Sequence, residues 1–416
     1  MEFTEKKIRK KKYCVAWGAA LKNVEVIWLV LTQKLKLVVV GDSDEKNRVY
    51  QYIRNGQYTQ YKAMNYMMGQ LMAGYYEGNM DIKSEEFKSA QAKLKSDHPL
   101  LAQFEFPKGL DQKSIILRKV QQDFSIALKN GLARGERNIA SYRRTNPLLT
   151  NGRNVKLTHG YNSEDELKEA MSTNQWDIAV SWVNKIRFKI VFAKNPVKDM
   201  RTKDIIYNLL TSEEYKVCGS SIGIDGKKII LNLSYQMPER EEKLDDDVYF
   251  AVKFGIDTPA IGVSSKYPNT CIFFGDGENF IGQRLYLQRR IRELQRELSL
   301  TSGGHGRKAK LRPLEKYRRR EKDFARTFNH QISRQIVNEA RKARAKTILM
   351  EDMSEYSKEY KNTLILRNWS YYQLAQDVKY KAKQLGMNVA EVKTGLEPSE
   401  CVELDYLHAI LAGYKK

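Results

Sequence analysis

The apolar positions in the N-terminal half of the chain follow two different periods. The segment KLKLVVV at residues 34–40 is typical of a buried strand. Residues 45–120 instead place apolar side chains three and four positions apart, which predicts helices. Strand patterns return further along the chain, at 154–157, 178–192 and 215–234. The pattern therefore predicts a β-rich module that is interrupted by a helical insertion.

The last of these strand segments contains a hairpin signal and is followed by an acidic run. In IGIDGKKIILNLSY (222–235), Asp225 and Gly226 are residues that tolerate the positive φ of a tight β-turn. The acidic run EREEKLDDD at 239–247 is typical of a solvated linker. We therefore expect a domain boundary at this run.

From residue 248 onward, strand and helix patterns alternate. Strands are predicted for YFAVKFGID (249–257) and, after a turn, for CIFFGD (271–276). Two long helices follow, at 281–300 and 314–344, because large apolar residues recur every three or four positions. A strand KTILM, a helix over 369–385, a strand MNVAEV and a last helix from Asp405 complete the segment. This order predicts an α/β domain, and the whole chain is predicted to be a multi-domain α+β protein.

Positive charge is in large excess. The 416 residues include 72 Lys and Arg against 50 Asp and Glu, which gives a formal net charge of +22. Charge of this size favours a polyanionic partner, either nucleic acid or a membrane surface. No long basic helix with an apolar face free for lipid is evident in the sequence, so we expect nucleic acid and no membrane.

The cysteines and the N-terminus bear on the cellular compartment. The four cysteines are Cys14, Cys218, Cys271 and Cys401. None lies within zinc-ligand spacing of another, which favours free thiols in a reducing compartment. The N-terminal KKIRKKKYCVAWGAAL loosely resembles a signal peptide, but Lys22 and Glu25 soon break its apolar stretch. We expect a cytoplasmic protein in which residues 1–34 form a basic extension.

Three acidic residues occupy positions suited to metal-dependent phosphodiester cleavage. Asp257 and Glu351 end predicted strands, and Asp405 begins the last helix. Such cleavage uses carboxylates close enough to share two magnesium ions about 4 Å apart. Each acid alone is more often a helix cap or a surface group, whereas the three in this order of elements are more specific.

Two long segments of the chain resemble a known family. They are GGHGRKAKLRPLEKYRRREKDFARTFNHQISRQIVNEARKARAKTILMEDM and LRNWSYYQLAQDVKYKAKQLGMNV. Both resemble the RuvC core of the miniature type V-F CRISPR effectors and their transposon-encoded TnpB relatives. The block GLARGERNIASYRRTNPL resembles the helical-to-β junction of the same family. The resemblance is close in the C-terminal part and loose over residues 35–150.

The resemblance implies an architecture, a metal site and partners. Residues 1–41 and 151–247 would form a discontinuous, β-barrel-like wedge module, 42–150 a helical recognition domain, and 248–416 a RuvC-type, ribonuclease-H-like nuclease domain. Asp257, Glu351 and Asp405 would be both the catalytic and the metal-binding residues, with two Mg²⁺ ions as cofactors. The implied partners are a guide RNA, double-stranded target DNA and a second copy of the chain on the same guide.

The sequence departs from the family pattern at three places. Asp257 is followed by Thr-Pro where the family has Leu-Gly, and Asp405 by Tyr-Leu-His-Ala where it has Asn-Ala-Ala. The four-cysteine zinc ribbon is replaced by GLEPSECVEL (395–404), which contains one cysteine, so no zinc is expected. Two functions stay open. One is RNA-guided DNA binding with magnesium-dependent cleavage. The other is nuclease-inactive guided binding that regulates transcription or recruits a partner protein.

Basic side chains on and near the long helices are the predicted nucleic-acid contacts. A solvated charged face is the alternative, but cations on phosphates suit a protein that reads the shape of a heteroduplex while base pairing reads sequence. The tyrosines and methionines of residues 50–76 predict helix core, with base stacking as the alternative. His330 is predicted to be a core or phosphate-facing residue rather than a metal ligand. The predicted contacts are Tyr142, Arg143, Arg144, Arg289, Arg290, Arg292, Arg296, Arg307, Arg318, Arg319, Arg320 and Arg367.

The neighbouring genes would separate the functional alternatives. A CRISPR array beside the gene favours immunity, and an adjacent transcription-factor gene favours regulation. A transposon-encoded nuclease with a different guide is the third alternative. In each case we expect the protein in the cytoplasm, and on the nucleoid when it is bound to DNA.

Overall fold

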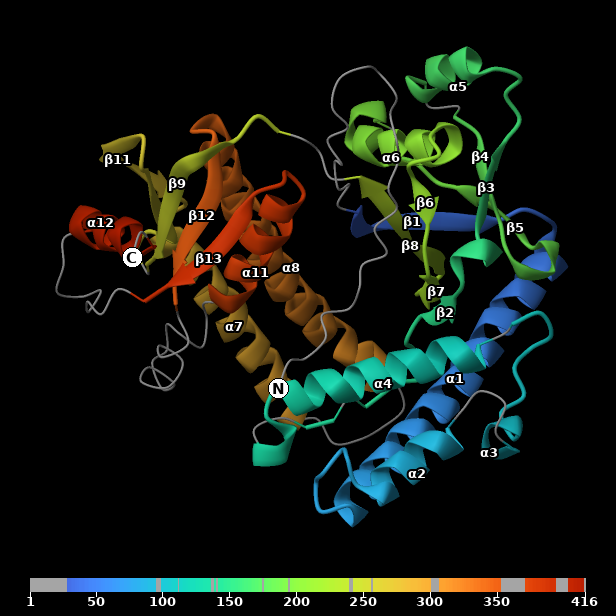
Figure 1. Cartoon of the computed structure of the whole chain (residues 1–416). Coiled ribbons are helices and arrows are strands. Elements are labelled where there is room, and N and C mark those ends of the chain that lie inside the picture. Colours follow the sequence, from blue (N-terminus) through green and yellow to red (C-terminus); the bar gives the residue numbers. More distant parts are fainter. Residues whose placement is uncertain are drawn as a thin grey trace, which may run out of the picture. The chain divides into compact units, whose positions relative to one another are not determined.

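The chain divides into two compact units, Met1–Pro238 and Glu239–Lys416, here called the first and second unit (Figure 1). The computed structural model describes residues 28–94, 99–110, 112–135, 138–139, 141–173, 176–193, 195–238, 242–255, 257–300, 307–352, 371–393 and 403–414. Most of the predicted N-terminal extension therefore lies outside the described residues. Helices and strands occur in both units, so the α+β class predicted from the sequence is confirmed.

The first unit is built on an eight-stranded antiparallel sheet. Its strands follow the order β2-β7-β8-β1-β5-β4-β3, with β6 also paired to β8. The longest pairing joins β1 to β8, from Trp28 opposite Pro238 to Leu37 opposite Ile229. The strands are β1 (Trp28–Val39), β2 (Leu148–Thr150), β3 (Lys156–His159), β4 (Ile178–Ser181), β5 (Arg187–Ile190), β6 (Lys216–Val217), β7 (Ser220–Asp225) and β8 (Lys228–Pro238).

Strand β1 forms because its apolar residues recur at every second position. Leu35, Leu37 and Val39 are buried in the core, whereas Val38 and Val40 lie on the other face and are about half exposed. The predicted strand is thus confirmed, although it is buried on one face only. The predicted hairpin is also confirmed: Asp225 pairs with Lys228, and Gly226 has φ +62°.

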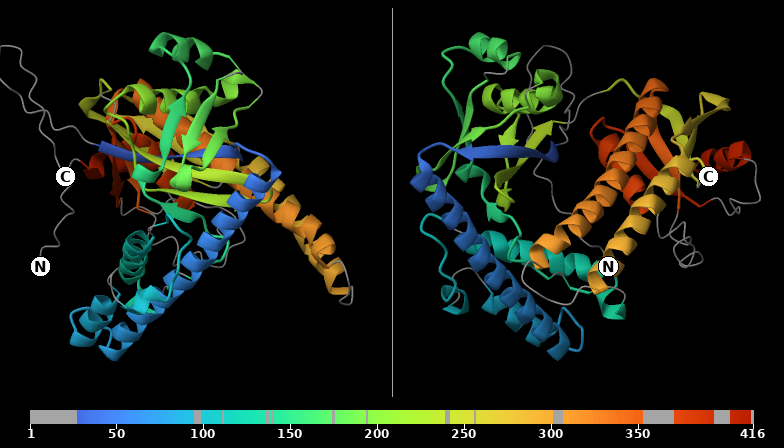
Figure 2. Two further views of the ribbon diagram at one scale, coloured as in Figure 1. Left: turned by 90° about the vertical axis from the view of Figure 1, so that its right-hand side faces the viewer. Right: turned by 180° about the vertical axis from the view of Figure 1, so that it is seen from behind.

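Four helices of the first unit form a second core. Helix α1 (Ser43–Glu77) begins at Asp42, whose carboxylate accepts a hydrogen bond from the Glu45 amide at 2.7 Å. It packs against α2 (Glu85–Lys93) and α4 (Lys113–Lys129), and Figure 2 shows α2 alongside α1 in both views. Helix α3 (Pro99–Ala102) is short. Met67, Met68 and Tyr75 are buried among these helices, so the core interpretation is confirmed for these three, whereas Tyr58 and Tyr76 of the same segment are exposed.

Two helices that the sequence patterns did not indicate accompany the sheet. They are α5 (Glu164–Met171) and α6 (Met200–Thr211). The buried Lys203 of α6 joins them, because its ammonium group donates hydrogen bonds to the carbonyl oxygens of Met171 at 2.6 Å and Thr173 at 2.9 Å. A cation at the end of α5 satisfies carbonyl groups that have no partner within the helix.

The second unit has a five-stranded mixed sheet in the order β11-β10-β9-β12-β13. Strands β9 (Asp245–Phe254), β10 (Ala260–Ser264) and β11 (Tyr267–Phe274) are antiparallel. Strand β12 (Ala345–Glu351) is parallel both to β9 and to β13 (Asn388–Val392). Because β9 and β12 are parallel, their carboxyl ends meet at the same edge of the sheet.

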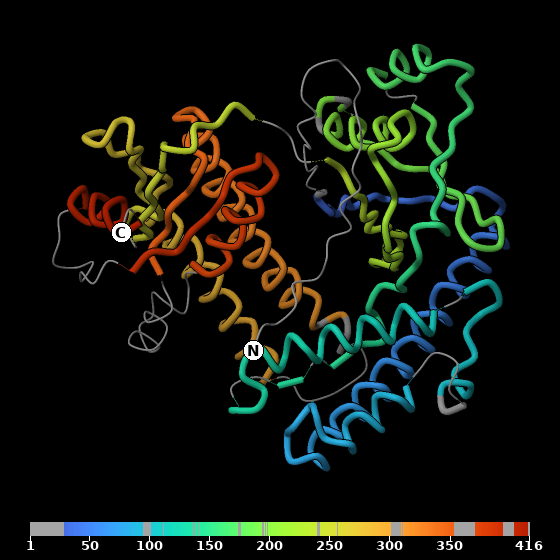
Figure 3. The backbone as a smooth tube through the Cα atoms, in the orientation of Figure 1, coloured from blue at the N-terminus to red at the C-terminus, as the bar shows by residue number. Residues whose placement is uncertain are grey.

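Helices cover both faces of this sheet. Phe250, Val252 and Phe254 of β9 point into a core shared with α7 (Gly277–Leu300), α8 (Arg307–Lys342) and α11 (Tyr371–Lys383). Ala251, between them, points to the opposite face and packs with α12 (Glu403–Tyr414). Figure 3 shows α12 on one side of the sheet and α8 and α11 on the other.

Two sequence predictions in this unit were wrong. The segment between the first two predicted strands is not a turn alone, because it contains the fully buried strand β10. Gly262 in β10 lies so close to Phe250 that an added Cβ would stand 2.6 Å from that ring. The acidic run at 239–247 is not wholly a linker, because β9 begins at Asp245, which pairs with Ala345.

Candidate functional site

Glu351 is the acid most firmly positioned by the fold. It is the last residue of β12, as predicted, and only 3% of its surface is exposed. The amide of Phe254, at the end of the parallel strand β9, donates a 2.9 Å hydrogen bond to Oε1. Burial raises the pKa of Glu351 to about 7, against the opposing effects of the Phe254 amide, the Tyr406 side chain and the Lys253 charge.

The other two predicted acids are exposed. Asp257 follows the end of β9 by three residues, and its carbonyl oxygen accepts a hydrogen bond from the amide of Gly277 at 2.9 Å. Asp405 lies in the first turn of α12, as predicted. Within the described part of the chain, no group of three or more His, Cys, Asp or Glu side chains is close enough to hold a metal ion.

Two tyrosines, Tyr371 and Tyr406, lie near Glu351. The pKa of Tyr371 is raised by burial and then by the negative charges of Glu351 and Asp257, so both carboxylates act on one phenol. Tyr406, the neighbour of Asp405, reaches Glu351 from α12 and lowers its pKa by hydrogen bonding. Tyr371 thus lies near Glu351 and Asp257, whereas Asp405 is linked to Glu351 only through its neighbour Tyr406.

The chemistry of Glu351 fits a magnesium ligand. Its second carboxylate oxygen, Oε2, is buried without a well-formed hydrogen bond among the described residues. A buried carboxylate oxygen that lacks a donor is stabilised by a cation, and carboxylates are ligands that Mg²⁺ prefers. Lys253 is the nearby resident cation, and its ammonium group lies 5.0 Å from the centre of the Tyr406 ring.

The predicted arginines of α7 and α8 lie on a helical hairpin. Arg284 of α7 holds it together through a 2.9 Å ion pair with Glu321 of α8. Arg290 pairs with Glu293 at 2.7 Å, and Arg319 lies 3.7 Å from Asp323. The side chain of Arg307, and Arg367 as a whole, are outside what the structure describes. Of the predicted arginines on the hairpin, the exposed ones are Arg289, Arg292, Arg296, Arg318, Arg319 and Arg320.

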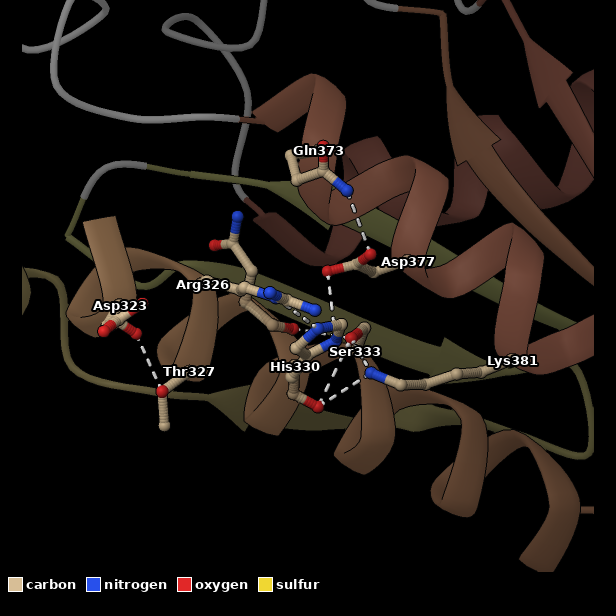
Figure 4. Close-up of polar contacts among 9 residues, drawn as sticks. Asp323, Arg326, Thr327, His330, Ser333, Gln373, Asp377 and Lys381 are labelled. Carbon is tan, nitrogen blue, oxygen red and sulfur yellow. Dashed lines mark hydrogen bonds and ion pairs between the residues drawn. The ribbon is translucent and has the colours of Figure 1, made fainter. Parts of the chain in front are cut away.

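His330 joins α8 to α11 through a polar network (Figure 4). Its Nδ1 lies 3.4 Å from a carboxylate oxygen of Asp377, and Gln373 donates a 3.0 Å hydrogen bond to the other oxygen. The buried Lys381 donates to the carbonyl oxygen of His330 at 2.8 Å and to the hydroxyl of Ser333. Burial lowers the pKa of His330, and Asp377 opposes that shift. The His330 side chain itself is exposed, so of the two predicted alternatives it is not a core residue, although its contacts with Asp377 and Lys381 join two helices.

Replacing Lys381 by alanine is expected to lower the free energy of unfolding by about 2 kcal/mol. The change leaves the His330 carbonyl and the Ser333 hydroxyl without their buried donor. Urea unfolding of the full chain measures the effect. Lys383→Ala, an exposed position on the same helix, is the control and should change little. Equal losses in the two variants would contradict a structural role for the network.

Three predicted nucleic-acid contacts lie in the first unit; one of them is buried, and the other two are exposed to solvent. Tyr142 is 7% exposed, and its hydroxyl donates a 3.0 Å hydrogen bond to Asp123, so its ring belongs to the core rather than to a nucleic-acid surface. Arg143 and Arg144 are exposed. The Arg144 guanidinium lies 4.8 Å from the centre of the Tyr58 ring.

Four further exposed cations gather around a concavity of about 490 Å³ at β3, β4 and β5. They are Arg153, Lys156, Lys185 and Arg187. None was singled out from the sequence, because the first two are about thirty positions from the others. The sequence signal that could have found them is their position within or beside the predicted strands, because a charged residue in a strand points to the solvent face of its sheet.

Comparisons with known proteins find similarity to CRISPR-associated proteins. No family model matches it. It is 29% identical over 290 residues to the CRISPR-associated endodeoxyribonuclease Cas12f1 of Sulfoacidibacillus thermotolerans, covering 67% of this chain and 65% of that protein. It is 30% identical over 179 residues to the protein of the same name from Syntrophomonas palmitatica, covering 42% and 35%. The chain thus spans less than two thirds of these curated relatives.

A solved structure shares the fold. The cryo-EM structure of a Cas12f1-sgRNA-target DNA complex aligns with a TM-score of 0.65 at 15% identity, covering 91% of this chain and 92% of that chain. Separately, none of the helices in the described ranges is long and apolar enough to span a bilayer.

Proposed function

We propose that the chain, which is similar to the Cas12f1 proteins, is a miniature type V-F CRISPR effector that binds a guide RNA and uses it to recognise double-stranded DNA. The net charge of +22 supports this function, because phosphate contacts supply sequence-independent affinity. In such a protein, base pairing with the guide reads the DNA sequence and the protein reads backbone shape. The exposed arginines of α7 and α8, with Arg143 and Arg144, would make phosphate contacts.

The proposal includes an assignment of modules. The sheet of the first unit would be the wedge module, the helices α1 to α4 the recognition domain, and the second unit a RuvC-type, ribonuclease-H-like domain without a zinc ribbon. Residues 395–404, which replace the ribbon in the sequence, are described only from residue 403 onward. A second copy of the chain on the same guide, and a cytoplasmic location with nucleoid association, belong to the same proposal.

The single observation that carries the nuclease proposal is the buried Glu351 at the carboxyl end of β12, whose Oε2 has no well-formed hydrogen bond among the described residues. Asp257, Glu351 and Asp405 would hold magnesium, which stabilises the attacking and leaving oxygens of phosphodiester cleavage when it is bound. The chain itself orients Glu351 through the Phe254 amide. Packing of Tyr371 and Tyr406 around this carboxylate keeps bulk water from it.

Guided binding without cleavage is the second candidate function. It is favoured by the exposure of Asp257 and Asp405 and by the lack of a three-acid group within the described ranges. In that case the bound complex would regulate transcription or recruit a partner protein.

Sequencing of the RNA that copurifies with the protein tests the guide proposal. The protein is expressed with its native locus, and we expect one abundant structured RNA, because guided recognition requires a defined guide. A charge-matched protein without a guide function would retain cellular RNA without preference. Recovery of only heterogeneous RNA would therefore overturn the proposal.

A further inference from the structure

A buried lysine lies beside the buried acid of the candidate metal site. Lys253 of β9 is 6% exposed, and Glu351 of β12 is 3% exposed. Burial raises the pKa of Glu351, and the Lys253 charge is one of the effects that oppose this rise, so the two groups are close enough to interact. A buried charge is costly unless a charge of opposite sign compensates it. The protein therefore supplies a positive charge of its own beside Glu351.

Strand pairing explains why the two residues are neighbours. In the parallel pairing of β12 with β9, Leu349 lies opposite Ala251, and both residues pack towards α12. Glu351 and Lys253 come two positions further along each strand, at the carboxyl ends. Side chains two positions apart in a strand point to the same face of the sheet. Glu351 and Lys253 therefore stand side by side on the face that α12 covers.

Helix α12 and strand β10 enclose the lysine. The Tyr406 ring of α12 has its centre 5.0 Å from the Lys253 ammonium group, within the range of a cation–π interaction. Tyr406 also forms a side-chain hydrogen bond with Glu351. On the other side of β9, Lys253 is paired with Ile261 of β10, which belongs to the same apolar core as Tyr406. Because Lys253 is enclosed in this way, it acts on the metal site through Glu351 rather than by touching a substrate.

The charges of these residues bear on the number of cations that the site can hold. Two magnesium ions bring four positive charges among the carboxylates. The acidic site, formed by Asp257, Glu351 and Asp405, would supply three negative charges, and Lys253 compensates one of them. One magnesium ion neutralises the remaining two. A second ion would leave excess positive charge beside a buried ammonium group, and like charges a few ångströms apart in a protein repel strongly.

We propose that Lys253 takes the place of a second magnesium ion, so that the acidic site holds one ion, and that Lys253 is a positioning residue for Glu351. The inference rests on the proposed function, because it takes the three acids as metal ligands, but it does not depend on the guide RNA.

Calorimetric titration with MgCl₂ tests this on the full-length protein, freed of nucleic acid and metal, at pH 8.5. The wild type should bind one ion. Lys253→Met keeps the length of the side chain but removes its charge, and it should bind two ions. Lys253→Arg restores the charge and should again bind one. The control is Lys266→Met, which removes an exposed charge from the same unit and should bind one ion as the wild type does.

A purely structural pairing of Lys253 with Glu351 predicts the same number of ions in the wild type and in Lys253→Met, and that result would overturn the proposal. Two ions bound to the wild type would also overturn it, even if Lys253→Met failed to fold. In Glu351→Gln the ion should bind weakly, whereas undiminished binding would place the ion elsewhere. A wild type that binds no ion would refute the proposal together with the metal site, but the guide RNA would still be decided by sequencing.

Discussion

Asp257→Ala, Glu351→Ala and Asp405→Ala are each expected to abolish magnesium-dependent cleavage of a guide-matched plasmid, by about a thousandfold or more, while guided binding stays nearly intact. A metal ion contributes several kcal/mol to transition-state stabilisation, and about 4 kcal/mol corresponds to a thousandfold in rate. Binding should survive because affinity comes from base pairing and from basic surfaces away from these acids. The measurements are plasmid cleavage and a guided-binding assay on the same preparations.

The control for these variants is Asp323→Ala, which removes an exposed carboxylate from α8. It should cut and bind as the wild type does. Cleavage at the wild-type rate in all three acid variants would refute the assignment of the triad. If the wild-type protein bound the matched DNA through its guide but did not cleave it, the result would favour the regulatory function.

Magnesium affinity is expected to rise by about tenfold per pH unit from pH 5 to pH 7 and to level off above pH 8. The sign follows from the pKa of Glu351, which burial raises to about 7. Below that pH the carboxyl group holds a proton, which the metal must displace, and above it the carboxylate is already ionised. Competition with one proton gives the tenfold slope, which calorimetric titration of the full-length protein with MgCl₂ measures.

The matched variant is Glu351→Gln, which preserves the size of the side chain and its acceptor for the Phe254 amide. It should bind magnesium weakly and without this pH dependence. If magnesium affinity of the variant depended on pH as steeply as that of the wild type, the titrating group would be a residue other than Glu351. A wild-type affinity that stays flat from pH 5 to pH 8 would exclude Glu351 as a ligand.

Sequence periodicity alone determined the helical hairpin and the strand before Glu351. Residues 281–300 repeat large apolar side chains every three or four positions, and α7 covers Gly277–Leu300. The run KTILM is apolar and short, and it forms the centre of β12. Local preference and burial agree in these segments, so neighbouring residues suffice to predict them. The net charge likewise needs no structure to indicate a polyanionic partner.

Tertiary contacts decided what local pattern could not. AIGVS in β10 contains a glycine that weakens a strand signal, but the space at Gly262 is filled by the Phe250 ring. Asp245 belongs to an acidic run that was predicted to be a linker. It is instead the first residue of β9, because Ala345 of the distant strand β12 pairs with it. Tyr142 was predicted as a nucleic-acid contact because it precedes two arginines, but its ring is buried in the core formed with α1 and α4.

The acidic site and the basic concavity at β3, β4 and β5 also differ in how much of each the sequence alone could predict. The three acids could be singled out one by one, because each follows a strand or begins a helix. The burial of Glu351 and of its Oε2 depends instead on β9, α11 and α12, which come from distant parts of the chain. The basic concavity was invisible in the sequence, because Lys156 and Arg187 meet only through their register with Ser181. Local side-chain spacing determines elements, whereas strand pairing and packing between distant segments determine which charges share a site.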